Sequence, residues 1–137
     1  MQLEEVTLVA QRLMREADID YLDMSLWDVA KEPEDERCKG RSLMSYFTEL
    51  DRGRVKLGAA GKISSAADAQ RAMESGLDFV VIGRGAILHH DFPRRVQEDP
   101  DFAPVALPVS PDYLRGEGLG DAFVDYMRRW EGFVDDD

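Results

Sequence analysis

The sequence has few cysteines and histidines and no long apolar run, the features that disulfides, metal centres and membrane spans require. Its 137 residues include a single cysteine, Cys38, and only two histidines. We therefore expect no disulfide framework and no site made from several cysteines. No run of about 18 apolar residues is present, the length that a membrane-spanning helix requires. Met1 to Glu5 also lack the basic region and apolar stretch of a signal peptide, so we expect a cytoplasmic protein without a membrane partner.

Basic residues are outnumbered by acidic ones. The chain has 28 acidic and 17 basic residues and a formal net charge of -11. This excess of negative charge argues against nucleic acid or an anionic membrane as a partner, because both carry negative charge themselves. With 44% hydrophobic residues, the chain has the composition of a single globular domain or of a piece of one.

Helical and strand-like segments alternate along the chain. The first segment, residues 2–17, has apolar residues at steps of three and four, which is typical of an amphipathic helix. The further segments are predicted strands at 20–26, 55–61 and 79–82, and predicted helices at 42–50, 65–76, 86–96 and 121–130. This alternation predicts an α/β fold with a parallel sheet and right-handed crossovers. Residues 79–82 are apolar throughout, as expected of a strand that helices cover on both faces.

Glycine-rich turns follow the second and third predicted strands. They are Gly58-Ala59-Ala60-Gly61-Lys62 and Gly83-Arg84-Gly85, about one strand-helix unit apart. In TIM barrels, the loops after the last two strands often build a phosphate site, because backbone N–H groups at a helix start attract anions. Lys62 and Arg84 add positive charge. The alternative is that these glycines only form tight turns between strands and helices.

Two common nucleotide-binding motifs are excluded by their spacing. A P-loop needs glycine where this chain has Lys56 and serine or threonine where it has Ile63. A dinucleotide fingerprint that starts at Gly83 would need its third glycine where Leu88 stands. We therefore expect neither a Walker A site nor a Rossmann domain.

His89, His90 and Asp91 are the most obvious metal-ligating residues. Because neighbours in a helix do not share a face, and because the chain has no other histidine, we expect no metal site. Ser25 does not lie in a Gly-x-Ser-x-Gly sequence, so hydrolase chemistry has no support.

Residues 55–63, 67–76 and 77–84 together resemble the last two βα units of the Old Yellow Enzyme family, the FMN-dependent NAD(P)H:flavin oxidoreductases. Asp-Phe-Val-Val-Ile-Gly-Arg at 78–84 is the most specific part, and Asp20 to Ser25 resembles the sixth strand of that barrel. The resemblance implies a partial TIM (β/α)8 barrel, its last three βα units with strands 6–8, over residues 1–100. A C-terminal extension with one helix and an acidic, disordered end would then span residues 101–137.

In that family, backbone amides after strand seven and a Gly-Arg pair after strand eight hold the FMN phosphate. The resemblance therefore implies that Ala60, Gly61, Lys62, Gly83 and Arg84 bind the cofactor.

Two further residues are candidates for contact with substrate. Trp27 follows the first predicted strand, and residues at that end of a barrel strand face the active site. The tail Tyr126-Met127-Arg128-Arg129-Trp130 resembles a family tail whose arginine reaches into a neighbouring subunit, although Arg129 replaces the family's glycine. This match makes Arg128 the second candidate.

The resemblance also implies what the chain lacks. The family's carbonyl-binding His-His or His-Asn pair and its catalytic tyrosine lie in strands that precede this segment. We therefore expect the C-terminal, FMN-phosphate-binding part of an NAD(P)H-dependent ene-reductase, inactive without the missing strands. It would need a complementary N-terminal barrel fragment or self-association, and the complete enzyme would use NAD(P)H and an enone-type substrate.

Two alternatives remain open. One is a non-enzymatic half-barrel that binds a phosphate-bearing ligand or only itself. The other is a phosphosugar enzyme, for which the strand ends offer no titratable residues beyond Asp23, Asp28 and Lys62.

Overall fold

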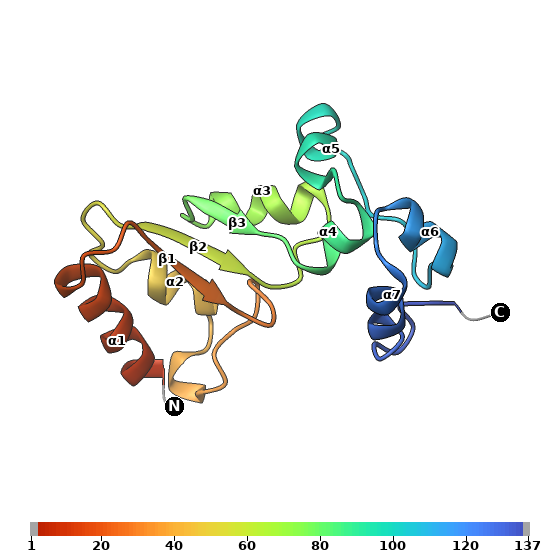
Figure 1. The fold of residues 1–137 in the computed structure, drawn as a ribbon. Coiled ribbons are helices and arrows are strands. Elements are labelled where there is room, and N and C mark those ends of the chain that lie inside the picture. The colour runs from red at the N-terminus through yellow and green to blue at the C-terminus, as the bar shows by residue number, and fades with distance from the viewer. Residues whose placement is uncertain (1–2, 136–137) are drawn as a thin grey trace. The chain divides into compact units, whose positions relative to one another are not determined.

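The computed structural model describes residues 3–135, which form one three-stranded parallel sheet and seven α-helices (Figure 1). The chain divides into two compact units. The first holds the residues through Ile63 together with Asp68–Ile82, and the second holds Ser64–Ala67 and the chain from Gly83 onward. In the described range, no helix is long and apolar enough to cross a membrane.

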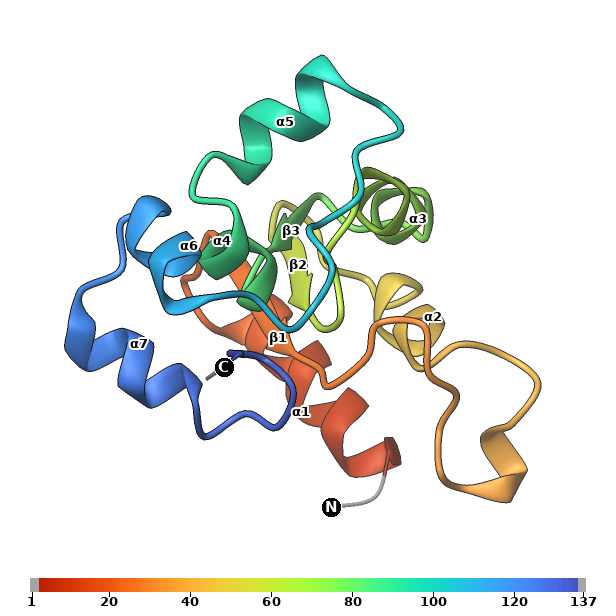
Figure 2. The ribbon, with the colours of Figure 1, turned by 90° about the vertical axis from the view of Figure 1, so that its right-hand side faces the viewer.

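The sheet lies in the first unit and has the strand order β1-β2-β3. Its strands are β1 (Tyr21–Ser25), β2 (Lys56–Ala60) and β3 (Phe79–Val81), all parallel, with Tyr21 opposite Lys56 and Gly58 opposite Phe79. The helices of the unit are α1 (Leu3–Glu16), α2 (Leu43–Thr48) and, from Asp68 onward, α3 (Ala66–Glu74), and a short 3-10 turn, η1, spans Glu36–Cys38. Figure 2 shows α2 and α3 on the same side of the sheet.

The core of the first unit lies between the helices and one face of the sheet. Side chains in a strand alternate between its faces, so every second residue of β1 and β2 points at the helices. These residues are Leu22, Met24, Leu57 and Ala59, and they pack with Ala10 and Met14 of α1, Met44 and Phe47 of α2, and Ala69 and Ala72 of α3. Burial of these apolar side chains is the main force that holds the helices to the sheet.

The opposite face of the sheet carries an aromatic pair. Tyr21 is 63% exposed, and its ring meets that of Phe79 edge-on with centroids 5.8 Å apart. Phe79 reaches across Gly58, where an added Cβ would overlap its ring. A side chain at position 58 would therefore displace the Phe79 ring from its place beside the middle strand.

Asp78 links β2 and β3 at the end of the sheet where both strands begin. Its Oδ2 accepts a hydrogen bond from the Leu57 N–H at 2.9 Å, and its carboxylate pairs with Lys56 Nζ and Arg52 Nη1, each at 3.1 Å. The hydrogen bond from Leu57 is the largest cause of a lowered pKa for Asp78, followed by the one from Lys56. One side chain thus fixes the register of two strands.

The second unit is helical and has its own core. Its helices are α4 (Arg84–Leu88), α5 (Phe92–Glu98), α6 (Pro111–Gly116) and α7 (Asp121–Met127). Leu88, Leu114, Val124, Met127 and Phe133 are buried together. A β-bridge between Val109 and Val134 closes the end of the chain onto this core.

The expectation of a partial TIM (β/α)8 barrel with strands 6–8 is wrong. The described residues form a small α/β fold with a three-stranded parallel sheet and seven α-helices, and the helices after β3 build a unit with a core of their own. Alternating strands and helices with glycine at the strand ends occur in all parallel α/β folds, so that pattern does not single out a barrel.

Several sequence-based boundaries differ from the structure. The single helix predicted at 86–96 is replaced by two helices, α4 and α5, separated by residues 89–91, and the segment beyond residue 100 has two helices, α6 and α7, where one was expected. We predicted one division, between residues 100 and 101, whereas the compact units group residues 83–100 with the C-terminal segment. Of the predicted acidic end, Asp136 and Asp137 lie outside the described residues.

Candidate functional site

The carboxyl ends of β1 and β2 form the candidate site of the first unit. The segments that follow these strands are joined by two backbone hydrogen bonds, from Leu26 N to Ala60 O at 2.8 Å and from Val29 N to Gly61 O at 3.3 Å. Ligands of open parallel sheets bind outside the carboxyl ends of the strands, so this is the edge at which a ligand is expected.

Gly61 and Lys62 have unusual backbone angles. Gly61 has a φ of +153°, and a Cβ at this position would lie 2.5 Å from the Leu26 carbonyl oxygen. Lys62 follows with a φ of 50°, a left-handed conformation that few residues other than glycine adopt. Strained backbone of this kind is concentrated at binding and catalytic sites.

Two ion pairs border the same edge. Lys62 Nζ lies 3.1 Å from Asp28 Oδ2, and Arg71 Nη2 pairs with Asp68 Oδ1. Asp28 Oδ1 also accepts a hydrogen bond from the Ala30 N–H at 2.9 Å. The pKa of Asp28 is lowered first by this backbone hydrogen bond and then by Lys62, which keeps its carboxylate charged.

These charged side chains surround a cavity of about 280 Å³. It is lined by Asp28, Val29, Ala30, Lys62, Asp68, Arg71 and Ala72. Two lysine or arginine charges face two carboxylates, so the lining as a whole is neutral. An anionic ligand therefore has to replace a carboxylate beside one of the two cations.

The predicted phosphate residues fall into different units. Ala60, Gly61 and Lys62 belong to the first, and Gly83 and Arg84 to the second. Gly83 caps the start of α4, and the Arg84 guanidinium lies 5.0 Å from the centroid of the Trp130 ring. Arg84 thus takes part in a cation–π contact within its own unit.

The two candidates for substrate contact are also in different units. Trp27 follows β1 directly and is 66% exposed, next to Asp28 in sequence. Arg128 ends α7, and its Nε lies 3.3 Å from Asp125 Oδ1. Each stays a predicted contact residue.

His89 is held in the core of the second unit by a hydrogen-bond chain. Its Nε2 accepts from the Val105 N–H at 3.0 Å, its Nδ1 lies 3.3 Å from the Tyr113 hydroxyl, and that hydroxyl donates to Leu88 O at 2.8 Å. This arrangement fits a neutral imidazole with its hydrogen on Nδ1. Burial is the largest cause of its lowered pKa, which favours the neutral imidazole.

The contribution of α3 to the cavity was not predicted from the sequence. The sequence pattern indicates Asp68 only as part of a helix start, and it gives Arg71 no separate role. Their spacing of three residues on a helix is a sequence signal for an ion pair. Their position beside Lys62, however, depends on how α3 packs on the sheet.

Comparison with models of known protein families found no match, and no curated protein matched the sequence.

Proposed function

We propose that the chain binds the phosphate group of a small-molecule ligand at the cavity beside Lys62, with FMN as the first ligand to test. FMN is chosen because of the resemblance of residues 55–84 to the Old Yellow Enzyme family. In this role, FMN itself supplies the hydride chemistry, and the protein supplies binding and orientation.

The observation that carries the proposal is the cavity at the carboxyl ends of β1 and β2. Gly61 lets the backbone pass close to the neighbouring loop, and Lys62 and Arg71 offer charged donors at the cavity wall. Pockets for whole ligands usually have about 300 to 1,000 Å³. At about 280 Å³, this cavity suits a phosphate group better than a complete flavin.

Binding proceeds by exchange of partners. A phosphate oxygen takes the place of the Asp28 carboxylate at Lys62 Nζ, and Asp28 keeps its hydrogen bond from Ala30. Because Asp28 competes with the ligand for Lys62, its negative charge lowers phosphate affinity. Removing that charge while keeping the side-chain shape should strengthen binding.

Calorimetric titration with inorganic phosphate and with FMN tests this proposal. Lys62→Ala should weaken binding by roughly 10- to 100-fold, the equivalent of a charge-assisted hydrogen bond of about 1.5 to 3 kcal/mol. Asp28→Asn should strengthen it. Lys56→Ala is the matched control, because Lys56 is a lysine at the opposite end of β2.

Equal affinity of Lys62→Ala and the unchanged protein would contradict the proposal, and so would an equal loss in Lys56→Ala. Arg84→Ala in the same titration tests separately whether the Gly83-Arg84 turn contributes to FMN binding. If Arg84 contributes, FMN affinity falls in that variant.

Self-association is a second candidate function, favoured by the aromatic pair of exposed Tyr21 and half-buried Phe79 on the sheet. Tyr21, Phe79 and Val81 border a shallow surface hollow of about 530 Å³. Patches of exposed apolar side chains often mark protein interfaces. Phe79→Glu should abolish any concentration-dependent dimer seen by sedimentation velocity, and a dimer that survives this change would exclude the face as its interface.

A further inference from the structure

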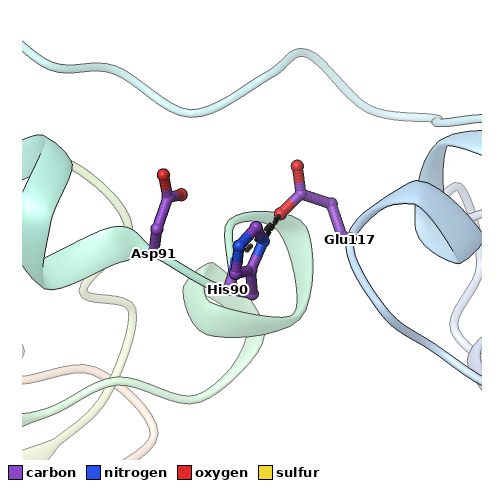
Figure 3. Close-up of side chains that lie close together, drawn as sticks. All are labelled: His90, Asp91 and Glu117. Atoms are coloured by element: carbon purple, nitrogen blue, oxygen red, sulfur yellow. Dashed lines mark hydrogen bonds and ion pairs between the residues drawn. The ribbon is translucent and has the colours of Figure 1, made fainter.

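Three side chains with metal-ligating atoms meet in the second unit. They are His90, Asp91 and Glu117, and one ligand atom from each lies within 4.8 Å of the others (Figure 3). His90 and Asp91 lie in the turn between α4 and α5, and Glu117 lies 27 residues beyond His90 at the end of α6.

The Glu117 carboxylate is already held in place. Its Oε2 accepts a hydrogen bond from the His90 backbone N–H at 2.9 Å and lies 2.7 Å from His90 Nδ1, as the dashed lines in Figure 3 indicate. Its side chain is only 11% exposed, whereas that of His90 is 64% exposed. One ligand is therefore fixed and nearly buried, and another is open to solvent.

Asp91 is the third member of the cluster, beside the His90–Glu117 pair. The Asp91 carboxylate brings a second negative charge to the cluster, and Arg95 Nε, 2.6 Å from Asp91 Oδ1, offsets part of it. A carboxylate oxygen of Asp91, one of Glu117 and a ring nitrogen of His90 thus lie within 4.8 Å of one another, close enough for a single cation to attract both negative charges.

We propose that His90, Asp91 and Glu117 bind a divalent transition-metal ion such as Zn²⁺. One imidazole nitrogen and two carboxylate oxygens are the donors that this class of ion accepts, and three protein ligands leave a coordination position open for water. The ion takes the place of the hydrogen between His90 Nδ1 and Glu117 Oε2, and the imidazole N–H is then on Nε2.

The ligands need a modest rearrangement around the ion. With bonds of about 2.0 Å, neighbouring ligands of a tetrahedral zinc lie about 3.3 Å apart. Glu117 stays where its backbone hydrogen bond holds it, the more exposed His90 ring moves from 2.7 Å to about 3.3 Å from Glu117 Oε2, and the Asp91 carboxylate moves closer to both. The turn before α5 is then linked to the end of α6, so the ion stabilises the second unit.

Binding of Zn²⁺ to the full chain, measured by calorimetry, tests this inference. Because even outer partners of metal ligands contribute about 10- to 100-fold to affinity, His90→Gln and Glu117→Gln should each weaken binding by at least about tenfold. The amide oxygen introduced by Glu117→Gln can still accept from the His90 N–H, so this variant removes the ligand charge and preserves the hydrogen bond. Glu98→Gln, at the end of α5, is the matched control and should bind normally.

Nuclear magnetic resonance supplies a readout that identifies the ligand. The chain has two histidines, and His89 is buried with both ring nitrogens engaged. Zn²⁺ should shift the Nδ1 resonance of His90 and leave that of His89 in place, and it should raise the Tm of the unchanged protein but not of His90→Gln. Binding that persists in His90→Gln, an unshifted His90 resonance, or no binding at millimolar Zn²⁺ would each overturn the proposal.

Discussion

Replacing Gly61 with alanine tests the close approach of two loops, the one after β2 and the one after β1. The new Cβ would lie 2.5 Å from the Leu26 carbonyl oxygen and 3.0 Å from the Asp28 nitrogen. Both are backbone atoms, so relief requires the two loops to move apart. The φ of +153° adds strain that glycine does not have.

The expected loss of stability follows from these two contributions. Forced contacts in packed regions cost about 1 to 3 kcal/mol, and a residue in a sparsely populated backbone region costs about 1 to 3 kcal/mol more. Gly61→Ala should therefore lower the free energy of unfolding by about 2 to 6 kcal/mol. Gly53→Ala is the control, since Gly53 has a φ of +51° and no atom within 4 Å of its added Cβ. Gly53→Ala should therefore lose only the cost of the left-handed backbone, about 1 to 2 kcal/mol.

Urea unfolding, followed by far-UV circular dichroism and by tryptophan fluorescence, measures the difference. Trp27 is the sole tryptophan of the first unit and Trp130 that of the second, so a Trp130→Phe background reports on the unit that contains Gly61. Equal losses in the Gly61 and Gly53 variants would refute the reasoning, because the close approach to Leu26 would then contribute nothing.

The remaining predictions concern the two cores and the sheet register. Since the pKa of Asp78 is lowered, its stabilising contribution is complete above the ordinary aspartate pKa and disappears as the pH falls through the folded value. The stability difference between the unchanged protein and Asp78→Asn should therefore shrink below about pH 4 in urea titrations, and a constant difference would disagree with this. Gly58→Ala should destabilise the protein by about 1 to 3 kcal/mol, and adding Phe79→Leu should recover part of that loss; strict additivity in this double-mutant cycle would show that the two do not touch. Leu114→Ala, at a fully buried position, should lower the free energy of unfolding by about 2 to 5 kcal/mol, with a near-zero loss as the contrary result.

Local patterns predicted most helices and every strand of the described sheet. The apolar stripe of α1 and the apolar run of β3 are signals within one segment, and the structure has a helix and a strand there. The α/β class and the parallel pairing followed from their alternation. The number of strands in the complete fold could not be predicted from the sequence, because the repeated strand-helix unit is common to many parallel sheets.

Proline explains two of the missed elements. Pro93 lies in the first turn of α5 and Pro111 in the first turn of α6, where the missing N–H has no partner to lose. We predicted one continuous helix across the first and no helix around the second. Ser110, whose side chain accepts from the Tyr113 N–H at 3.1 Å, was the additional sequence signal for the start of α6.

The candidate sites were less predictable because their parts are distant in sequence. Asp28 and Lys62 meet only through the packing of two strands, and Glu117 joins His90 only through the second core. We expected no metal site because neighbours on one helix do not share a face, and in the structure the turn at His89 and His90 breaks that helix.

The path of the chain determines which truncated fragments of this protein can retain their contacts. Ser64–Ala67 belongs to the second unit, and the Ala66 N–H donates to Phe102 O at 3.0 Å. A fragment that starts at Gly83 therefore loses a backbone partner of Phe102, and a fragment that ends at Ile82 leaves the Ala66 N–H without its acceptor. Fragments that contain the second unit should accordingly begin before Ser64. Fragments divided at residue 82 should be less stable on both sides of the division.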